Sequence, residues 1–432
     1  MRRKLTNKYL ILGMSLLMLG VLFSTPAVFA QKKSEVVFWT SFSGQPERGV
    51  MDEMVARFCK LHPEIKVKKV VVPGTETEVA KLLTSLAAGV GPDVYHLDRF
   101  TVCQRAAAGV LQPLDKYIKG IRQEIEKAYL DFAWKECVWQ DKVWALPWDT
   151  DVRALYYRKD FFREAGLNPP RTIAELDECA EKLTIRKNGK LERMGFVPWW
   201  NQGWHYTWGW AFGGEFYDEK AQKITANDPK IVESFAWQKS YCDKYGMKAL
   251  EAFSAAYETQ TESLNPFVSG KVAMIVTGDW FIAFMKQFGP DVDYGIIPIP
   301  RPAEYKEPIS WSGGWSMVIP IGAKNPEGAA EFIKWYCGPE ANEIYARGTY
   351  HLPVSKKAFE VTSLREEPRY KIFLDLLPYS RCRPVIPVGA LYWDELTAAR
   401  DYVIHGKKTP KQALDDVVAR VQAELDKILG KK

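Results

Sequence analysis

Short apolar runs and amphipathic helical segments alternate along the first part of this chain, and this alternation restricts the fold more than any other feature. Apolar runs of strand length lie at 35–39, 65–72 and 93–97. Between them, apolar residues recur at the spacing of one helical face over 50–61 and 79–86. Strands that alternate with helices form parallel sheets with right-handed crossovers, so the sequence predicts an α/β fold.

The same alternation returns in the second half of the chain. Thr172 and Glu175 have the spacing of a capping box, which begins a helix. Strands are expected at 271–276, 294–299 and 315–320. A chain of 432 residues is too long for one hydrophobic core, so we expect two domains. No low-complexity linker separates them, which indicates that the chain crosses between the domains on short ordered segments.

The first 30 residues have the composition of a secretory signal peptide. A basic start precedes an apolar run, and small residues follow up to Ala30. The alternative, an uncleaved membrane anchor, would need a longer apolar run. The first cysteine of the chain is Cys59, so no acceptor for a lipoprotein anchor follows the apolar run. We therefore expect cleavage before Gln31 and release into the periplasm.

Charge and cysteine content exclude several other classes. The 59 basic and 53 acidic residues become 55 and 53 once the four basic residues of the signal segment are removed, which leaves a net charge of +2. A nearly neutral protein lacks the excess of positive charge that binds nucleic acid. Seven cysteines without C-x-x-C spacing favour buried free thiols over disulfides. The dispersed histidines indicate no metal site, and no motif indicates a cofactor.

Tryptophan is concentrated in one part of the chain. Nine of the 16 tryptophans lie within 134–210, and the densest segment, 198–210, also holds Asn, Gln and His. A pyranose ring stacks its C–H faces on flat side chains, and its hydroxyl groups bind planar polar groups, so this mixture is typical of a sugar pocket. The alternative is that most of these indoles are core, because Trp200, Trp204 and Trp208 share one helical face.

Four further segments join aromatic to polar residues: 148–151, 278–280, 311–315 and 392–394. Each follows or ends an expected strand or turn, where loops present groups to a ligand. Glycine in 311–315 would let the backbone approach a ligand closely. Dispersed through one exported chain, these segments favour a binding pocket.

Several motifs also follow one another in a recognisable order. They are Val37-Phe38-Trp39-Thr40, Gly91-Pro92-Asp93-Val94, Trp144-Ala145-Leu146-Pro147, Gly270-Lys271-x-Ala273-Met274 and Gly278-x-Trp280. In order and spacing they resemble the extracellular solute-binding proteins of carbohydrate ABC importers, the broad group that includes maltose-binding protein. The resemblance covers nearly all of the chain after the signal segment.

The resemblance implies a type II periplasmic-binding-protein-like fold, with two α/β lobes joined by hinge strands and a ligand cleft between them. The N-terminal lobe is expected at 31–153 and 296–322, and the C-terminal lobe at 158–292 and 327–432. The chain is expected to cross between the lobes near 153–157, 294–298 and 322–326.

The resemblance and the aromatic segments together nominate ligand-binding residues and no catalytic residue. Asp98 with Arg99, Trp280 and Trp393 match positions that contact sugar in the family. The full set is Ser41, Ser43, Gln45, Asp98, Arg99, Trp148, Asp149, Asp151, Trp200, Trp204, Asp279, Trp280, Trp311, Gly313, Gly314, Trp315 and Trp393.

In function, the resemblance implies the substrate-binding component of an ABC transporter, which captures a sugar, most simply an oligosaccharide, and delivers it to membrane permease subunits. We expect a monomer. Two alternatives remain open. The solute could be a polyamine, glycerol phosphate or ferric iron, with Tyr156-Tyr157 as a candidate iron pair. The chain could instead be a glycoside hydrolase, with Asp149 and Asp151 as its two carboxylates.

Overall fold

The computed structural model describes residues 34–73 and 79–431. The expected signal peptide at 1–30 lies outside the described residues. Within the described ranges, no helix combines the length and the apolarity that crossing a membrane requires. All seven cysteines are free thiols, and five of them are buried, as the sequence predicted.

The first sheet follows the alternation that opens the sequence. β1 (Ser34–Thr40) pairs in parallel with β2 (Ile65–Val71) and with β3 (Val94–Asp98), which confirms the three predicted strands. β15 (Trp315–Val318) and β6 (Leu146–Pro147) continue the sheet in antiparallel fashion. The strand order is therefore β2-β1-β3-β15-β6.

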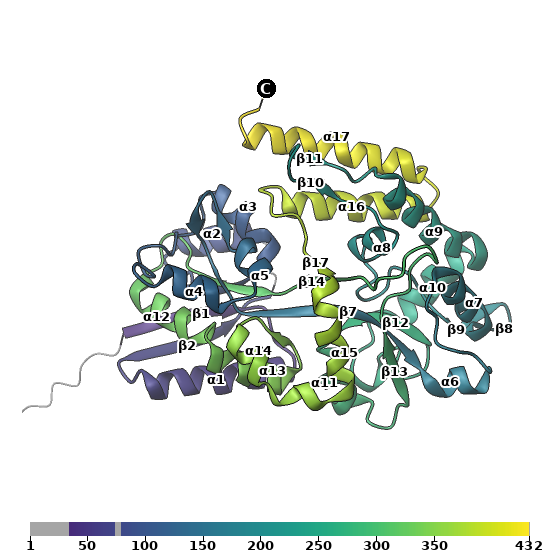
Figure 1. Ribbon diagram of the computed structural model, residues 1–432, viewed down its shortest axis with the longest axis horizontal. Coiled ribbons are helices and arrows are strands. Elements are labelled where there is room, and N and C mark those ends of the chain that lie inside the picture. Colours follow the sequence, from purple (N-terminus) through teal and green to yellow (C-terminus); the bar gives the residue numbers. More distant parts are fainter. Residues whose placement is uncertain (1–33, 74–78, 432) are drawn as a thin grey trace, which may run out of the picture. The chain divides into compact units, whose positions relative to one another are not determined.

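Helices from two distant parts of the chain cover this sheet (Figure 1). α1 (Glu47–Leu61) connects β1 to β2. Both α12 (Pro326–Tyr336) and α13 (Pro339–Thr349) pack against α1. The sequence assigned 327–432 to the C-terminal lobe, but the buried face of α12 belongs to the core of the first sheet. Its Phe332 ring packs on the Phe38 ring of β1, with the centroids 5.4 Å apart, and both residues belong to the first core.

The second sheet is built around β7 (Asp149–Arg158). β14 and β16 pair with the first half of β7, and β12 and β13 pair with its second half, all in antiparallel fashion. The bounds of these strands are β12 (Met274–Gly278), β13 (Tyr294–Ile297), β14 (Ser310–Gly313) and β16 (Leu352–Pro353), and β17 (Ser380–Arg381) pairs in parallel with β14.

The chain passes between the two sheets where β6 leads into β7 and where β14 leads into β15. The crossings expected at 153–157 and 294–298 lie inside the second sheet instead, because both segments pair there. The crossing expected at 322–326 leads into α12, which stays with the first core. Gly314 permits the β14–β15 passage: its φ is +128°, and a Cβ would lie 2.5 Å from the carbonyl oxygen of Asp149.

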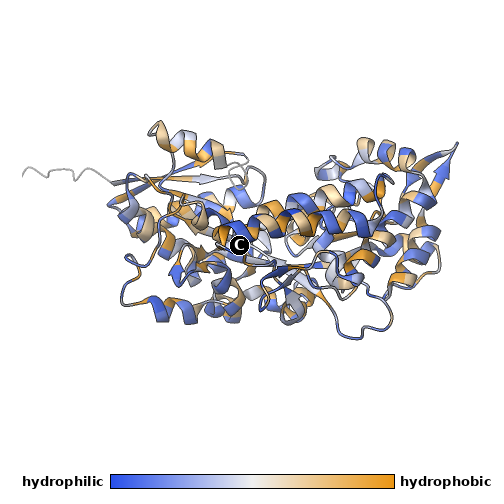
Figure 2. Ribbon diagram, turned by 90° about the horizontal axis from the view of Figure 1, so that it is seen from above, coloured by the Kyte–Doolittle hydropathy of each residue, from blue (hydrophilic) through white to orange (hydrophobic). Residues whose placement is uncertain are grey.

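The helices around the second sheet begin at recognisable caps. α7 (Ile173–Leu183) starts with the predicted capping box, in which the Thr172 hydroxyl accepts a hydrogen bond from the Glu175 N–H. α17 (Pro410–Ile428) starts with a second capping box and packs along α16 (Gly389–Ile404). Hydrophilic and hydrophobic residues alternate along α17, the helix nearest the marked C-terminus in Figure 2, because one face is buried.

The remaining helices are α2 (Val79–Ala87), α3 (Val102–Ala107), α4 (Arg122–Ala128), α5 (Asp131–Glu136), α6 (Lys159–Glu164), α8 (His205–Ala211), α9 (Pro229–Tyr245), α10 (Met247–Tyr257), α11 (Phe281–Phe288), α14 (Lys356–Val361) and α15 (Pro368–Leu376). The remaining strands form short hairpins: β4 (Val138–Trp139) with β5 (Lys142–Val143), β8 (Ile185–Lys187) with β9 (Lys190–Arg193), and β10 (Tyr217–Asp218) with β11 (Lys223–Ile224).

Candidate functional site

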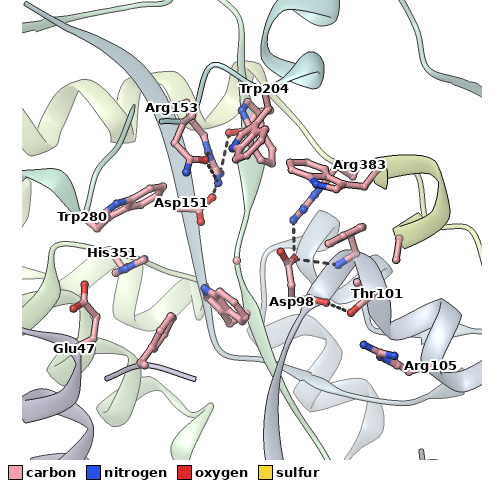
Figure 3. Close-up of a pocket in the computed structure, with 18 of the residues that line it drawn as sticks. Glu47, Asp98, Thr101, Arg105, Asp151, Arg153, Trp204, Trp280, His351 and Arg383 are labelled. Carbon is pink, nitrogen blue, oxygen red and sulfur yellow. Dashed lines mark hydrogen bonds and ion pairs between the residues drawn. The ribbon is translucent and has the colours of Figure 1, made fainter. Parts of the chain in front are cut away.

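A cavity of about 610 Å³ lies where the chain passes between the two sheets. Asp98 ends β3, and Asp151 and Arg153 lie on β7 (Figure 3). Trp311 lies on β14, so the end of β3 and the two crossing strands position the site. The lining residues are Phe42, Glu47, Asp98, Phe100, Thr101, Arg105, Asp151, Arg153, Gln202, Trp204, Trp280, Trp311, Gly314, Trp315, His351, Arg383, Ala390, Trp393 and Asp394.

One ion pair of the cavity joins the end of β3 to the segment before α16. Asp98 Oδ1 accepts a hydrogen bond from Arg383 Nη2 at 2.6 Å, and it also accepts from the Phe100 N–H at 3.5 Å. The Arg383 guanidinium carbon lies 3.8 Å from the centre of the Phe100 ring. Stacking on an aromatic face holds this cation in place while its edge remains available to partners.

A second ion pair lies on β7, two residues apart on one face of the strand. Arg153 Nη1 donates to Asp151 Oδ1, which also accepts from the Gly313 N–H at 2.6 Å. Arg153 Nε and Nη2 donate to Gln202 Oε1, each at 3.3 Å. The Arg153 guanidinium carbon lies 3.6 Å from the centre of the Trp311 ring.

Trp280 and His351 form another wall of the cavity. Their rings are stacked, with centroids 5.4 Å apart and planes inclined by 16°. Burial lowers the pKa of His351 to about 4, so the imidazole is neutral at neutral pH. Its Nδ1 lies 3.3 Å from Asp149 Oδ2, and burial raises the pKa of that carboxyl group well above its usual value.

A second histidine, His96, packs against the aromatic platform that Phe42 and Trp315 form on the first lobe. Phe42 and Trp315 line the cavity, and the His96 ring lies 4.7 Å from each of them, centroid to centroid. His96 is fully buried, and its two ring nitrogens contact the hydroxyl groups of Thr40 and Ser41, each at 2.9 Å. This arrangement fixes the aromatic platform at the ends of β1 and β15.

A family model for bacterial extracellular solute-binding proteins matches residues 44–343. The chain belongs to this family. The maltotriose-binding protein of Pyrococcus abyssi is 25% identical over 397 residues, which cover 90% of this chain and 82% of the relative. The galactooligosaccharide-binding protein of Bacillus subtilis is 25% identical over 424 residues, which cover 96% of this chain and 94% of the relative.

A solved structure, CpMnBP1 with mannobiose bound, has a TM-score of 0.81 and 30% sequence identity to this solute-binding protein. The superposition covers 90% of this chain and 100% of the other. The fold is therefore the one that the sequence resemblance implied: a type II periplasmic-binding-protein fold with two α/β lobes.

Eight of the nominated residues of this solute-binding protein line the cavity. They are Asp98, Asp151, Trp204, Trp280, Trp311, Gly314, Trp315 and Trp393. They come from the strand ends and from the aromatic segments, so both sequence signals identified part of the lining.

Nine nominated residues do not line the cavity: Ser41, Ser43, Gln45, Arg99, Trp148, Asp149, Trp200, Asp279 and Gly313. The first three belong to the loop after β1, where Ser41 contacts His96, Ser43 is exposed, and the Gln45 side-chain Oε1 accepts a hydrogen bond from the Gly49 N–H at 3.2 Å. This loop contributes Phe42 to the lining instead.

The other nominated residues outside the lining are buried in the scaffold. Trp148 is fully buried in the first core, and Trp200 is 3% exposed and stacks on Phe253. Asp279 Oδ2 accepts from the Leu352 N–H at 2.8 Å, which fastens β16 beside β12. Polar and aromatic residues of these types therefore serve the scaffold as well as the pocket.

Arg99, Asp149 and Gly313 are joined in one of these buried contacts. Arg99 donates to the carbonyl oxygens of Asp149 and Gly313, and its Nε donates to Glu136 Oε2 at 2.8 Å. Asp149 Oδ1 in turn accepts from the Trp315 N–H at 2.6 Å. Arg99 thus ties together the two strands that pass between the sheets.

Eleven lining residues were not nominated from the sequence: Phe42, Glu47, Phe100, Thr101, Arg105, Arg153, Gln202, His351, Arg383, Ala390 and Asp394. Arg153 could have been found, because residues i and i+2 of a strand share a face and Asp151 was already a candidate. Gln202 lies within the tryptophan-rich segment. His351 and Arg383 carry no comparable local signal.

Proposed function

We propose that this protein captures an oligosaccharide in the cavity between its lobes and delivers it, chemically unchanged, to the permease of an ABC importer. The observation that carries the proposal is the composition of the lining: five tryptophans lie beside two Asp–Arg pairs. Flat apolar rings match the C–H faces of a sugar, and paired donors and acceptors match its hydroxyl groups.

The relatives support the same class of ligand. Proteins named for binding maltotriose and galactooligosaccharide, and a structure that holds mannobiose, all match this chain over most of its length. The cavity volume of about 610 Å³ is within the range of small-molecule sites. The proposal includes periplasmic release through the segment at 1–30, and action as a monomer.

The hydrolase alternative needs two carboxylates that face the same sugar bond. Asp151 lines the cavity, but Asp149 is 1% exposed, accepts from the Trp315 N–H and does not line it. The pair that the sequence suggested is therefore not presented to a ligand. Incubation with mannotriose and maltotriose should release no reducing sugar, and steady release would favour an enzyme.

The ferric alternative needs a cluster of ligating side chains. Tyr156 is buried, and its hydroxyl donates to the Gly278 carbonyl at 2.9 Å within the second core. In the described part of the chain, no group of three or more His, Cys, Asp or Glu residues could hold a metal ion. Lack of a visible absorption band after incubation with ferric citrate would agree with the sugar proposal.

A thermal-shift screen tests the proposal directly. We expect one or more of mannobiose, mannotriose, maltotriose and galactobiose to raise the melting temperature, because a ligand that binds only the folded state at 100 times its Kd stabilises it by about 2.7 kcal/mol. Spermidine and glycerol 3-phosphate should have no effect. Stabilisation by either of these compounds, with none by any sugar, would overturn the proposal.

A further inference from the structure

The two Asp–Arg pairs of the cavity share one hydrogen-bonding plan. In each pair, carboxylate Oδ1 accepts from one guanidinium and from one backbone N–H: Arg383 and Phe100 for Asp98, Arg153 and Gly313 for Asp151. Within 34–73 and 79–431, neither Oδ2 atom has a hydrogen-bond partner, and neither is fully buried. Each aspartate therefore keeps one charged oxygen for a ligand.

One indole ring lies against both cations. The guanidinium carbon of Arg153 lies 3.6 Å from the centre of the Trp311 ring, and that of Arg383 lies 5.1 Å from it. Trp311 is only 2% exposed. It therefore supports the two arginines and offers little open face for stacking, whereas Trp280, Trp204 and Trp315 remain partly exposed.

The free groups of each pair match neighbouring hydroxyl groups. The open carboxylate oxygen accepts from one hydroxyl. The donor to the next hydroxyl oxygen is an Nη N–H group of Arg383 that Asp98 does not use, or the single Nη2 N–H of Arg153 that Asp151, Gln202 and the Trp311 carbonyl leave free. A vicinal diol supplies both partners at once. Hydrogen bonds to charged groups are about twice as strong as neutral ones, so this match has a large effect on affinity.

The same arrangement is unfavourable for an anion. Each guanidinium charge is already compensated by its aspartate, and the lining as a whole holds four carboxylates against three guanidinium groups. A ligand carboxylate or phosphate would meet the open Oδ2 atoms inside a partly desolvated cavity, where like charges repel strongly. A neutral sugar meets no such repulsion.

We propose that these two pairs act as a charge filter, which accepts neutral polyhydroxylated ligands through vicinal hydroxyl groups and rejects sugars that carry carboxylate or phosphate. This inference rests on the proposed function and narrows its substrate class. Asp98 and Asp151 are its specificity-determining residues, and Arg383 and Arg153 hold their carboxylates in place.

The test compares Asp98→Asn and Asp151→Asn with a matched control. Asparagine keeps the shape of the side chain and an accepting oxygen, but it removes the negative charge. Asp160→Asn is the control, because Asp160 pairs with Arg158 at 2.6 Å in the same Asp–Arg manner and does not line the cavity. Titration calorimetry uses mannotriose and maltotriose as neutral probes and trigalacturonate as the acidic probe of equal length.

Each cavity variant should bind the better neutral trisaccharide about 10- to 100-fold more weakly, because a charge-assisted hydrogen bond is replaced by a neutral one. Each should also bind trigalacturonate at least about 10-fold more tightly than the wild type does, because an uncompensated guanidinium now faces it. Asp160→Asn should match the wild type with both probes. Melting curves without ligand establish that each variant is folded.

Arg383→Gln separates the filter from general damage to the pocket. It leaves the Asp98 charge in place, so neutral affinity should fall while trigalacturonate stays rejected. The filter is overturned if the wild type binds trigalacturonate as tightly as the neutral sugars, or if the two Asp→Asn variants keep the wild-type preference. Wild-type protein that binds no neutral sugar would instead overturn the proposed function itself, and the filter with it.

Discussion

Two arginines of this solute-binding protein show how one residue type serves either the scaffold or the site. Arg99 is 1% exposed, pairs with Glu136, and donates to two main-chain carbonyl groups on the strands that pass between the sheets. Arg383 is 5% exposed, but it pairs with Asp98, whose side chain is 23% exposed, and it stacks on aromatic rings of the cavity. A cation whose donors are used by backbone acceptors belongs to the scaffold, and one that keeps donors for a ligand belongs to the site.

The first test of this distinction removes each of the two arginine cations in turn. Arg99→Met should lower the free energy of unfolding by about 3–5 kcal/mol, because Glu136 is left charged and buried without its partner. Arg383→Met should lower it by less than about 2 kcal/mol, because Asp98 keeps contact with solvent, and it should weaken sugar binding instead. Urea denaturation measures both. Equal losses of stability would remove the distinction between scaffold and site.

The second comparison concerns two tryptophans that the sequence nominated alike. Trp280 lines the cavity, whereas Trp148 is fully buried against Tyr345. Trp280→Ala should weaken trisaccharide binding by about 1–3 kcal/mol, the usual scale for loss of stacking on a planar ligand. The trisaccharide used is the one that stabilises the wild type in the thermal-shift screen. Trp148→Phe should leave Kd unchanged and lower the melting temperature. If Trp280→Ala binds as the wild type does, its ring is not a sugar platform.

Local signals in the sequence predicted the parts of this molecule that depend on nearby residues. The strands β1, β2 and β3 follow from apolar runs, and the start of α7 follows from its capping box. Trp280 and Trp393, which the family resemblance and their short aromatic–polar segments both nominated, line the cavity. Each of these inferences needed only a few consecutive residues.

What the sequence could not supply depends on contacts between distant segments. Arg383 reaches Asp98 across 285 positions of the chain, and no pattern around either residue predicts that meeting. Arg99 was assigned to the ligand through the family resemblance, and Trp148 and Asp279 through the aromatic segments, yet all three side chains are buried in the scaffold. Only the burial of each side chain and its partners separates these two roles.

A third test uses pH to examine the platform of the first lobe. Burial lowers the pKa of His96 from its usual 6.5 to about 3. Between those values the unfolded chain binds a proton that the folded protein does not, so the free energy of unfolding falls as pH falls, by up to about 1.4 kcal/mol per pH unit for this group. His96→Asn should have the shallower slope between pH 6 and pH 4.5 in urea denaturation.

Other buried histidines, His205 and His351, titrate in both proteins and cancel in the difference of slopes. Since His96 supports Phe42 and Trp315, the variant should also bind sugar more weakly at pH 7, where its titration plays no part. Parallel slopes for the two proteins would show that the His96 imidazole is not kept neutral by the fold.

The smallest expected effect comes from the residue next to the scaffold pair. Lys135 and Glu136 are neighbours in α5, and each makes an ion pair: Lys135 with Glu219 at 3.0 Å, Glu136 with Arg99 at 2.8 Å. The side chains of the first pair are 65% and 71% exposed, whereas those of the second are 0% and 1% exposed. The distances are nearly equal, so solvent is the main difference between them.

A double-mutant cycle of Lys135→Met and Glu219→Gln should therefore give a coupling energy below about 1 kcal/mol, which 1 M salt should reduce further. The corresponding cycle with Arg99→Met and Glu136→Gln should give a severalfold larger value with little salt dependence, because water and ions do not reach that pair. Equal coupling in the two cycles would mean that separation, and not burial, sets the strength of ion pairs in this protein. The distinction drawn between Arg99 and Arg383 would then lose its physical basis.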